Sequence, residues 1–170
     1  NEKIDYGKQF LYKSDVEQIR KYNDKFDDQL LSGNNKIVEL STSIINQRVD
    51  QAEKLRGKFF EKKLNFTADE TLELDPEKIT WVNSEKEFNT HWKKLFTHFT
   101  LSRYLSLVDE NKDDKDKTKK DKKKSKNDKK KKEKKLTNSE MITKAHNKVS
   151  KRYKKIFKRM KEKNHVDYME

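Results

Sequence analysis

The sequence predicts an all-α fold, in which a long antiparallel helical hairpin is joined by two further helices, an irregular strap and a lysine-rich flexible insert. Apolar residues recur every three or four positions in four separate segments, as they do on one face of a helix. The 170 residues include only 3 Gly and 1 Pro, too few for the many turns of a β-sandwich or barrel. The length suits one domain with its own core, so we predict a single helical domain over residues 1–170.

The first helix is predicted over residues 14–31. Ser14 and Glu17 have the spacing of a capping box, in which each side chain accepts a hydrogen bond from the other residue's backbone amide. Gly33 follows the helical pattern and tolerates the left-handed backbone that ends many helices. The apolar face consists of Val16, Ile19, Tyr22, Phe26 and Leu30.

The second helix is predicted over residues 36–63. The short connection from the first helix predicts that the two form an antiparallel hairpin. Its apolar positions again have helical spacing. They are Ile37, Leu40, Ile44, Ile45, Val49, Ala52, Leu55 and Phe59.

Residues 64–82 are predicted to form an irregular strap across the hairpin. Thr67 and Glu70 could cap a short helical turn, and Pro76 disfavours helix at the residue before it. The apolar residues expected to contact the hairpin are Leu72, Leu74, Ile79 and Trp81.

The third helix is predicted over residues 84–107, beginning with a capping box of Ser84 and Glu87. Aromatic side chains dominate its apolar face, and they could form either core or a groove for a partner peptide. We favour core for Phe88, Trp92, Leu95 and Phe99, and leave Tyr104 open. The full aromatic stripe is Trp81, Phe88, Trp92, Phe96, Phe99 and Tyr104.

The fourth helix is predicted to begin with a capping box of Thr137 and Glu140. Because apolar positions still recur at Tyr168 and Met169, we expect helix to continue beyond Glu170 in a longer protein. Its predicted apolar face consists of Ile142, Ala145, Val149, Tyr153, Ile156 and Met160.

Residues 109–135 form the lysine-rich insert, with 15 Lys against 8 Asp and Glu. This net charge of +7 is about half of the +13 of the whole chain, 43% of whose residues are charged and 30% hydrophobic. The insert has no apolar residue to bury, so we predict a disordered or fraying segment whose end could extend the fourth helix. It lacks the aromatics and arginines that nucleic-acid binders use, which favours a solvated loop with weak contact to anionic surfaces.

No catalytic, cofactor or metal site is predicted. The chain has no Cys and no G-x-S-x-G motif, and exposed lysines do not supply the buried lysine of a Ser-Lys dyad. His91 and His98 are seven residues apart, whereas paired zinc ligands on a helix are four apart, and neither His146 nor His165 has ligands at suitable spacing. We assign structural roles to the main acidic pairs, Asp27 with Asp28, Asp69 with Glu70, and Glu73 with Asp75.

Three segments carry a family resemblance. They are Phe10-Leu11-Tyr12-Lys13-Ser14-Asp15-Val16, then Phe26-Asp27-Asp28-Gln29-Leu30-Leu31-Ser32-Gly33, and FTADETLELD from Phe66 to Asp75. In this order they resemble the N-terminal domain of the tail-specific (carboxy-terminal processing) serine proteases of the S41 class. The resemblance covers roughly residues 9–107 and 136–170. The lysine content of the insert departs from the family pattern.

The resemblance implies that the chain is an excised, non-catalytic N-terminal domain of a periplasmic endopeptidase. The Ser and Lys catalytic residues and the PDZ domain of such a protein would lie outside this chain. The implied partners are the other domains of the protease, substrates with exposed C-terminal tails, and an adaptor protein. The periplasmic location rests on the resemblance alone.

Two other hypotheses come from the charge of the chain. One is a basic helical protein that binds nucleic acid or an anionic surface, with binding that weakens steeply as salt rises. The other is a stand-alone helical protein that contacts a membrane surface. No apolar run in the sequence is long enough to span a bilayer.

Overall fold

The computed structural model describes residues 5–22, 36–62, 64, 66, 70–120 and 136–162. These residues form four helices and no strand, which confirms the all-α prediction. The helices are α1 (Lys13–Arg20), α3 (Lys36–Phe60), α4 (Glu85–Lys120) and α5 (Asn138–Glu162). None of the helices in the described part is long and apolar enough to cross a membrane.

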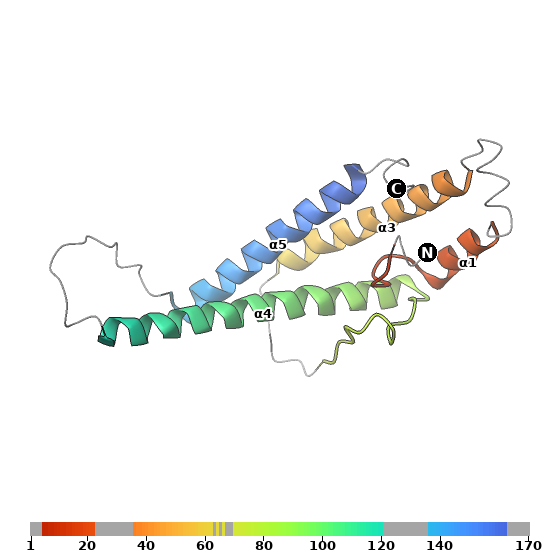
Figure 1. Ribbon diagram of the computed structural model, residues 1–170. Helices are drawn as coiled ribbons and strands as arrows, with labels where there is room; N and C mark the ends of the chain where they lie inside the picture. Colours follow the sequence, from red (N-terminus) through yellow and green to blue (C-terminus); the bar gives the residue numbers. More distant parts are fainter. Residues whose placement is uncertain are drawn as a thin grey trace.

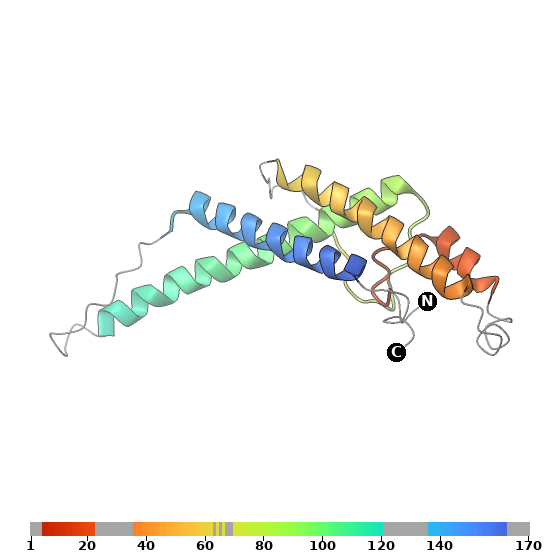
Figure 2. The same cartoon turned by 90° about the horizontal axis from the view of Figure 1, so that it is seen from above.

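The three long helices α3, α4 and α5 pack together, and the short helix α1 lies beside the start of α3 (Figures 1 and 2). The strap lies along the first half of α4, and the last turns of α4 project past the beginning of α5. The body is therefore a three-helix arrangement to which α1 and the strap are added. Among the described helices, the main partners of α3 are α4 and α5.

Helix α1 begins and is capped differently from the prediction. It begins at Lys13, and the carboxylate of Asp15 accepts a hydrogen bond from the backbone N–H of Tyr12 at 2.9 Å. The predicted capping box of Ser14 and Glu17 is wrong, because both side chains are exposed and the helix has already started. The predicted second half of this helix, with Phe26, Leu30 and the turn at residues 32–35, lies outside the described residues.

One continuous core joins the N-terminal segment to the long helices. Trp92, Phe88 and Phe96 of α4 are completely buried, as is Phe157 of α5. The predicted face of α3 is confirmed, with Ile37, Ile44, Ile45, Val49 and Ala52 buried and Leu40, Leu55 and Phe59 packed at the margin. Phe10, Leu11 and Tyr12, which precede α1, are also buried in this core.

The end of α4 differs from the prediction. The helix continues to Lys120 rather than ending near Leu107, so the first part of the insert, residues 109–120, is helical. Leu107 is buried with Met141 and Ala145 in a second, smaller apolar cluster, and Asn111 donates a hydrogen bond to the Leu136 carbonyl at 3.1 Å. These contacts with the start of α5 support α4 beyond the predicted end. Residues 121–135 lie outside the described residues.

The predicted capping box of α5 is confirmed, and that of α4 is confirmed in part, because Glu87 accepts from the N–H of Asn83 instead of that of Ser84. The Ser84 hydroxyl accepts a hydrogen bond from the Glu87 N–H at 3.2 Å, and Glu87 accepts one from the Asn83 N–H at 2.8 Å. At α5 the Thr137 hydroxyl accepts from the Glu140 N–H at 3.3 Å, while the Thr137 N–H donates to the Glu140 carboxylate at 2.7 Å. Each cap lies within four residues of sequence, so local pattern was sufficient to predict it.

The apolar face of α5 is rotated slightly from the predicted one. Its buried residues recur strictly every four positions: Met141, Ala145, Val149, Tyr153 and Phe157. Met141 and Phe157 were missed, whereas Ile142, Ile156 and Met160 are only partly buried. A four-residue spacing drifts slowly around the helix, which lets α5 contact α4 and α3 along its length. The expected continuation through Tyr168 and Met169 lies outside the described residues.

Candidate functional site

The histidine and acidic side chains of the described residues are dispersed rather than gathered in a metal-binding group. No group of three or more His, Cys, Asp or Glu side chains that could hold a metal ion occurs in this part of the chain. His91 and His98 both lie on α4, and His146 lies on α5. His165 lies outside the described residues. The features that could serve a function in the described residues are the surface hollows and the contacts that shape them.

The N-terminal segment is organised by a buried carboxylate. Asp5 is 5% exposed, and its side chain accepts hydrogen bonds from the backbone N–H groups of Gln9, Phe10 and Leu11 at 2.9, 2.8 and 2.9 Å. Three backbone donors satisfy the buried charge and fix the loop before α1. Phe10 and Leu11 are thereby held in the core, with the Phe10 ring 5.1 Å from that of Trp92.

A second buried carboxylate joins α1 to α3. Arg48 of α3 donates from Nε and Nη2 to the two oxygens of Asp15, at 2.7 and 2.8 Å. The guanidinium also lies 3.7 Å from the centre of the Tyr12 ring, and the Tyr12 hydroxyl accepts a hydrogen bond from Gln51. Hydrogen bonding to Asp15 raises the pKa of Arg48, while burial raises that of Tyr12. Asp15 thus has a long-range role in the segment that carried the family resemblance.

The aromatic stripe is core, as predicted for Phe88, Trp92, Leu95 and Phe99. The ring of Trp92 lies within about 6 Å of five other aromatic rings, and its Nε1 has no hydrogen-bond partner among the described residues. Burial raises the pKa of Tyr153 to about 12. Tyr104, which was left open, packs against the smaller apolar cluster. The rings around Trp92 are Phe10, Phe88, Phe96, Tyr153 and Phe157.

The strap is held to the body mainly through its backbone carbonyls. Lys8 donates to the carbonyls of Pro76 and Ile79 at 2.9 and 2.7 Å, and Lys94 of α4 donates to that of Thr71 at 3.1 Å. The Lys13 N–H donates to the Val82 carbonyl at 2.9 Å, where Tyr12 and Val82 form an isolated parallel bridge.

The apolar contacts of the strap agree only partly with the prediction. Leu72 and Trp81 pack against the core, as does Val82. Leu74 is 49% exposed, so its predicted contact with the body is wrong. The predicted turn at Thr67 lies outside the described residues.

A hollow of about 590 Å³ lies between the strap and the first turns of α4. Its lining combines apolar side chains with hydroxyl groups and charges of both signs. An extended peptide segment offers both apolar side chains and backbone polar groups, and this lining could contact both. The polar lining includes Thr71, Glu73, Lys78, Thr80, Lys86, Glu87, Thr90, His91 and Lys94, and the apolar lining consists of Leu72, Ile79 and Val82.

His91 is one of the residues that line this hollow. Burial lowers its pKa, and its Nε2 is buried with no hydrogen-bond partner among the described residues. His146, on α5, packs its ring 4.8 Å from that of Phe60 and likewise has its pKa lowered by burial. The two histidines therefore favour the neutral form in the folded chain.

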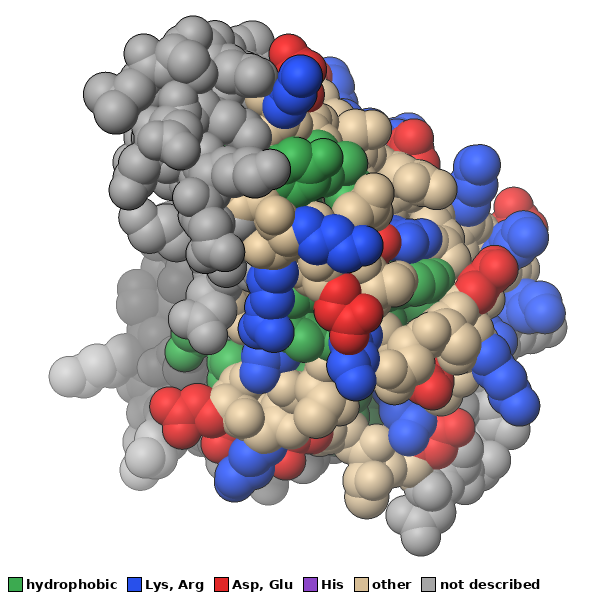
Figure 3. Space-filling model, turned by 90° about the vertical axis from the view of Figure 1, so that its right-hand side faces the viewer, with side chains coloured by type: hydrophobic (Ala, Val, Ile, Leu, Met, Phe, Trp, Pro, Cys, Tyr) green, Lys and Arg blue, Asp and Glu red, His purple; other side chains and the backbone are tan. Residues whose placement is uncertain are grey.

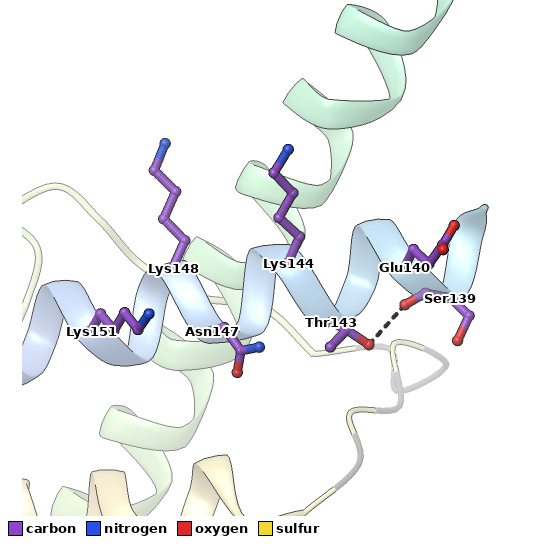
Figure 4. Close-up of a pocket in the computed structure, with 7 residues that line it drawn as sticks. All are labelled: Ser139, Glu140, Thr143, Lys144, Asn147, Lys148 and Lys151. Carbon is purple, nitrogen blue, oxygen red and sulfur yellow. Dashed lines mark hydrogen bonds between the residues drawn. The ribbon is translucent and has the colours of Figure 1, made fainter. Parts of the chain in front are cut away.

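A second hollow, of about 580 Å³, lies along the outer face of α5. Its described lining residues all come from this one helix and combine three lysines and neutral polar side chains with one acidic residue, Glu140. Lys144 and Lys148 project side by side from the helix in Figure 4, and the Thr143 hydroxyl donates to the Ser139 carbonyl. Asn147 and Lys151 continue the lining along the helix.

The acidic residues of the strap make local contacts. One oxygen of Glu73 accepts hydrogen bonds from the N–H groups of Leu74 and Asp75 at 3.0 and 2.9 Å. Asp75 accepts from the Glu77 N–H and pairs with Lys78. Glu70 is exposed, whereas residues 27, 28 and 69 lie outside the described residues.

The described residues thus form a helical body with a large aromatic core, a strap tied across α4, and surface hollows beside the strap and along α5. Residues 2–170 match the family described as Tail specific protease N-terminal domain. The chain belongs to this family, which confirms the resemblance on which the sequence interpretation rested.

Proposed function

We propose that this chain is the non-catalytic N-terminal domain of a periplasmic C-terminal-processing serine endopeptidase of the S41 class. The observation that carries the proposal is the family match over residues 2–170. In this role the helices form part of the wall that encloses a protein substrate. The catalytic Ser and Lys would come from another part of the protease.

The hollow between the strap and α4 is the surface that best suits docking of an adaptor or a substrate segment. It combines exposed backbone of the strap with the side chains of Thr90 and Lys94 on a rigid helix. The strap is fixed to the body by Lys8 and Lys94, so the walls of the hollow are set before a partner binds. Such preorganisation lowers the ordering cost of association.

The lack of catalysis is tested by incubating the purified 170-residue chain with an unstructured protein that has a free C-terminal tail. We expect no cleavage above that of a buffer control. Reproducible turnover that co-purifies with the chain would overturn the non-catalytic role.

The docking surface is tested in the intact protease with a photo-crosslinking amino acid at Thr90, in the hollow, and in a matched variant at Lys54, on the exposed side of α3. We expect crosslinks to substrate or adaptor from the first position and few from the second. Equal crosslinking at both positions would contradict docking in the hollow.

Cell fractionation tests the location. We expect the protein that carries this domain to be released with periplasmic markers. Recovery with ribosomes would instead favour the alternative of a basic nucleic-acid-binding protein.

A further inference from the structure

Five lysines form a straight line on the outer side of α5. Their spacing alternates between four and three residues, and at 3.6 residues per turn this keeps all five within an arc of about 80°. With a rise of about 1.5 Å per residue, the line is about 21 Å long. We call this row the lysine stripe; its members are Lys144, Lys148, Lys151, Lys155 and Lys158.

The lysine stripe faces solvent. All five side chains are exposed, while the buried row from Met141 to Phe157 is centred roughly 140° away around the helix. Lys158 forms an exposed ion pair with Glu162 at 3.4 Å. Among the described residues, no ion pair is found for the other four lysines, so their charges are not neutralised by the fold.

The positive charge of the sequence is concentrated in α5 and in the segment that precedes it along the chain. The helix has 9 Lys and Arg against 2 Asp and Glu. Residues 117–162 carry 22 Lys and Arg against 5 Asp and Glu, whereas the rest of the chain carries 21 against 25. Outside this region the chain is thus slightly acidic. The end of the molecule seen in Figure 3 mixes basic and acidic side chains, without a single-sign patch.

Neutral polar side chains flank the lysine stripe. Ser139, Thr143 and Asn147 share the α5 hollow with the first three lysines, and Glu140 is the one acidic residue that lines it (Figure 4). Hydroxyl and amide groups can donate hydrogen bonds to phosphate oxygens that the ammonium groups attract. The exposed residues of α5 include no large apolar side chain that would insert into a bilayer, so contact would be made with headgroups only.

We propose that the lysine stripe docks the domain on an anionic phospholipid surface. A flat charged plane can meet all five lysines of a straight row at once. Nucleic-acid sites also use stacked aromatics, whereas Tyr153 and Phe157 of α5 are buried. The exposed Arg152 and Arg159 lie beside the lysine stripe and add to its positive charge. The ammonium groups of lysines are carried on flexible side chains, so they can adjust to the mobile headgroups of a fluid membrane.

The test measures partition of the full chain onto vesicles of phosphatidylcholine, with and without phosphatidylglycerol, at an ionic strength of about 0.15 M. We expect binding only to the anionic vesicles, decreasing as salt rises. Each lysine near such a surface strengthens binding about fivefold. The triple variant Lys144→Gln, Lys148→Gln and Lys151→Gln should therefore bind about 100-fold more weakly.

A matched variant removes the same charge elsewhere, through Lys54→Gln, Lys58→Gln and Lys62→Gln. These lysines are exposed and recur at four-residue intervals. Arg56 contacts Ser150 of α5, and Lys54 and Lys58 lie on the opposite side of α3 from Arg56, away from the lysine stripe. We expect its binding to fall only a few fold, and circular dichroism to show both variants folded. Equal losses in the two variants would overturn the proposal. So would absence of binding to anionic vesicles, or tighter binding to duplex DNA at the same salt.

Discussion

Removing the Asp15 carboxylate should destabilise the domain strongly. This side chain accepts hydrogen bonds from the Tyr12 N–H at 2.9 Å and from Arg48 at 2.7 and 2.8 Å. The side chains of Arg48 and Asp15 are only 15% and 8% exposed. In Asp15→Ala, Arg48 would retain its position over the Tyr12 ring but lose its carboxylate partner.

The size of the effect follows from this burial. Removing one partner of a buried ion pair costs about 3–5 kcal/mol, because the remaining charge is left uncompensated. In a domain of this length each kcal/mol lowers Tm by roughly 2–4 °C. Thermal unfolding followed by circular dichroism should therefore show Tm reduced by roughly 6–20 °C in Asp15→Ala.

Two controls separate the buried pair from general effects. Glu162→Ala breaks an ion pair whose side chains are 74% and 61% exposed, and should cost less than about 1 kcal/mol. The double variant Asp15→Leu with Arg48→Met removes both charges and should be more stable than Asp15→Ala alone. A Tm for Asp15→Ala within about 2 °C of the parent chain would refute the reasoning.

Three further predictions concern the core and the buried titratable groups. Trp92→Ala should lower the free energy of unfolding, measured by chemical denaturation, by about 3–5 kcal/mol, because the indole is completely buried among five aromatic rings. A loss below about 1 kcal/mol would contradict this prediction. Burial raises the pKa of Tyr153 from 10.0 to about 12, so this side chain ionises in the unfolded chain before it ionises in the folded one. The free energy of unfolding should therefore fall by up to about 3 kcal/mol as the pH rises from 10.0 to about 12. The variant Tyr153→Phe should not show this fall. His91 has its pKa lowered below 6.5 by burial, so the unfolded chain takes up the proton first and stability should decrease as the pH falls below 6.5. His91→Gln should flatten this acid limb, and an unchanged pH profile would argue against a neutral buried imidazole.

Local sequence patterns predicted those helix starts and buried faces that depend on residues close to one another in the sequence. The caps at Ser84 and Thr137 and the buried face of α3 are examples, since each depends on residues close in sequence. The same kind of pattern gave the wrong capping residues for α1. Ser14 and Asp15 are adjacent and both are good capping residues, and only the structure shows that Asp15 contacts the Tyr12 N–H.

Long-range contacts explain the features that sequence reasoning missed. Arg48 is 33 residues from Asp15, and no local pattern pairs them. The extension of α4 into the insert was missed because composition alone suggested disorder, whereas contacts with the start of α5 support the helix there. A search for alternating four- and three-residue spacing among lysines would have found the lysine stripe before the structure was available.

The central claim is that this chain is the non-catalytic domain of a larger processing protease. The most direct measurement immunoprecipitates the native protein from cell extract with an antibody against this chain, then assays the precipitate on an unstructured protein with a free C-terminal tail. The account predicts an antigen much larger than 170 residues that cleaves the substrate, while the purified chain alone does not. An antigen of the size of this chain, with no peptidase activity in the precipitate, would contradict it.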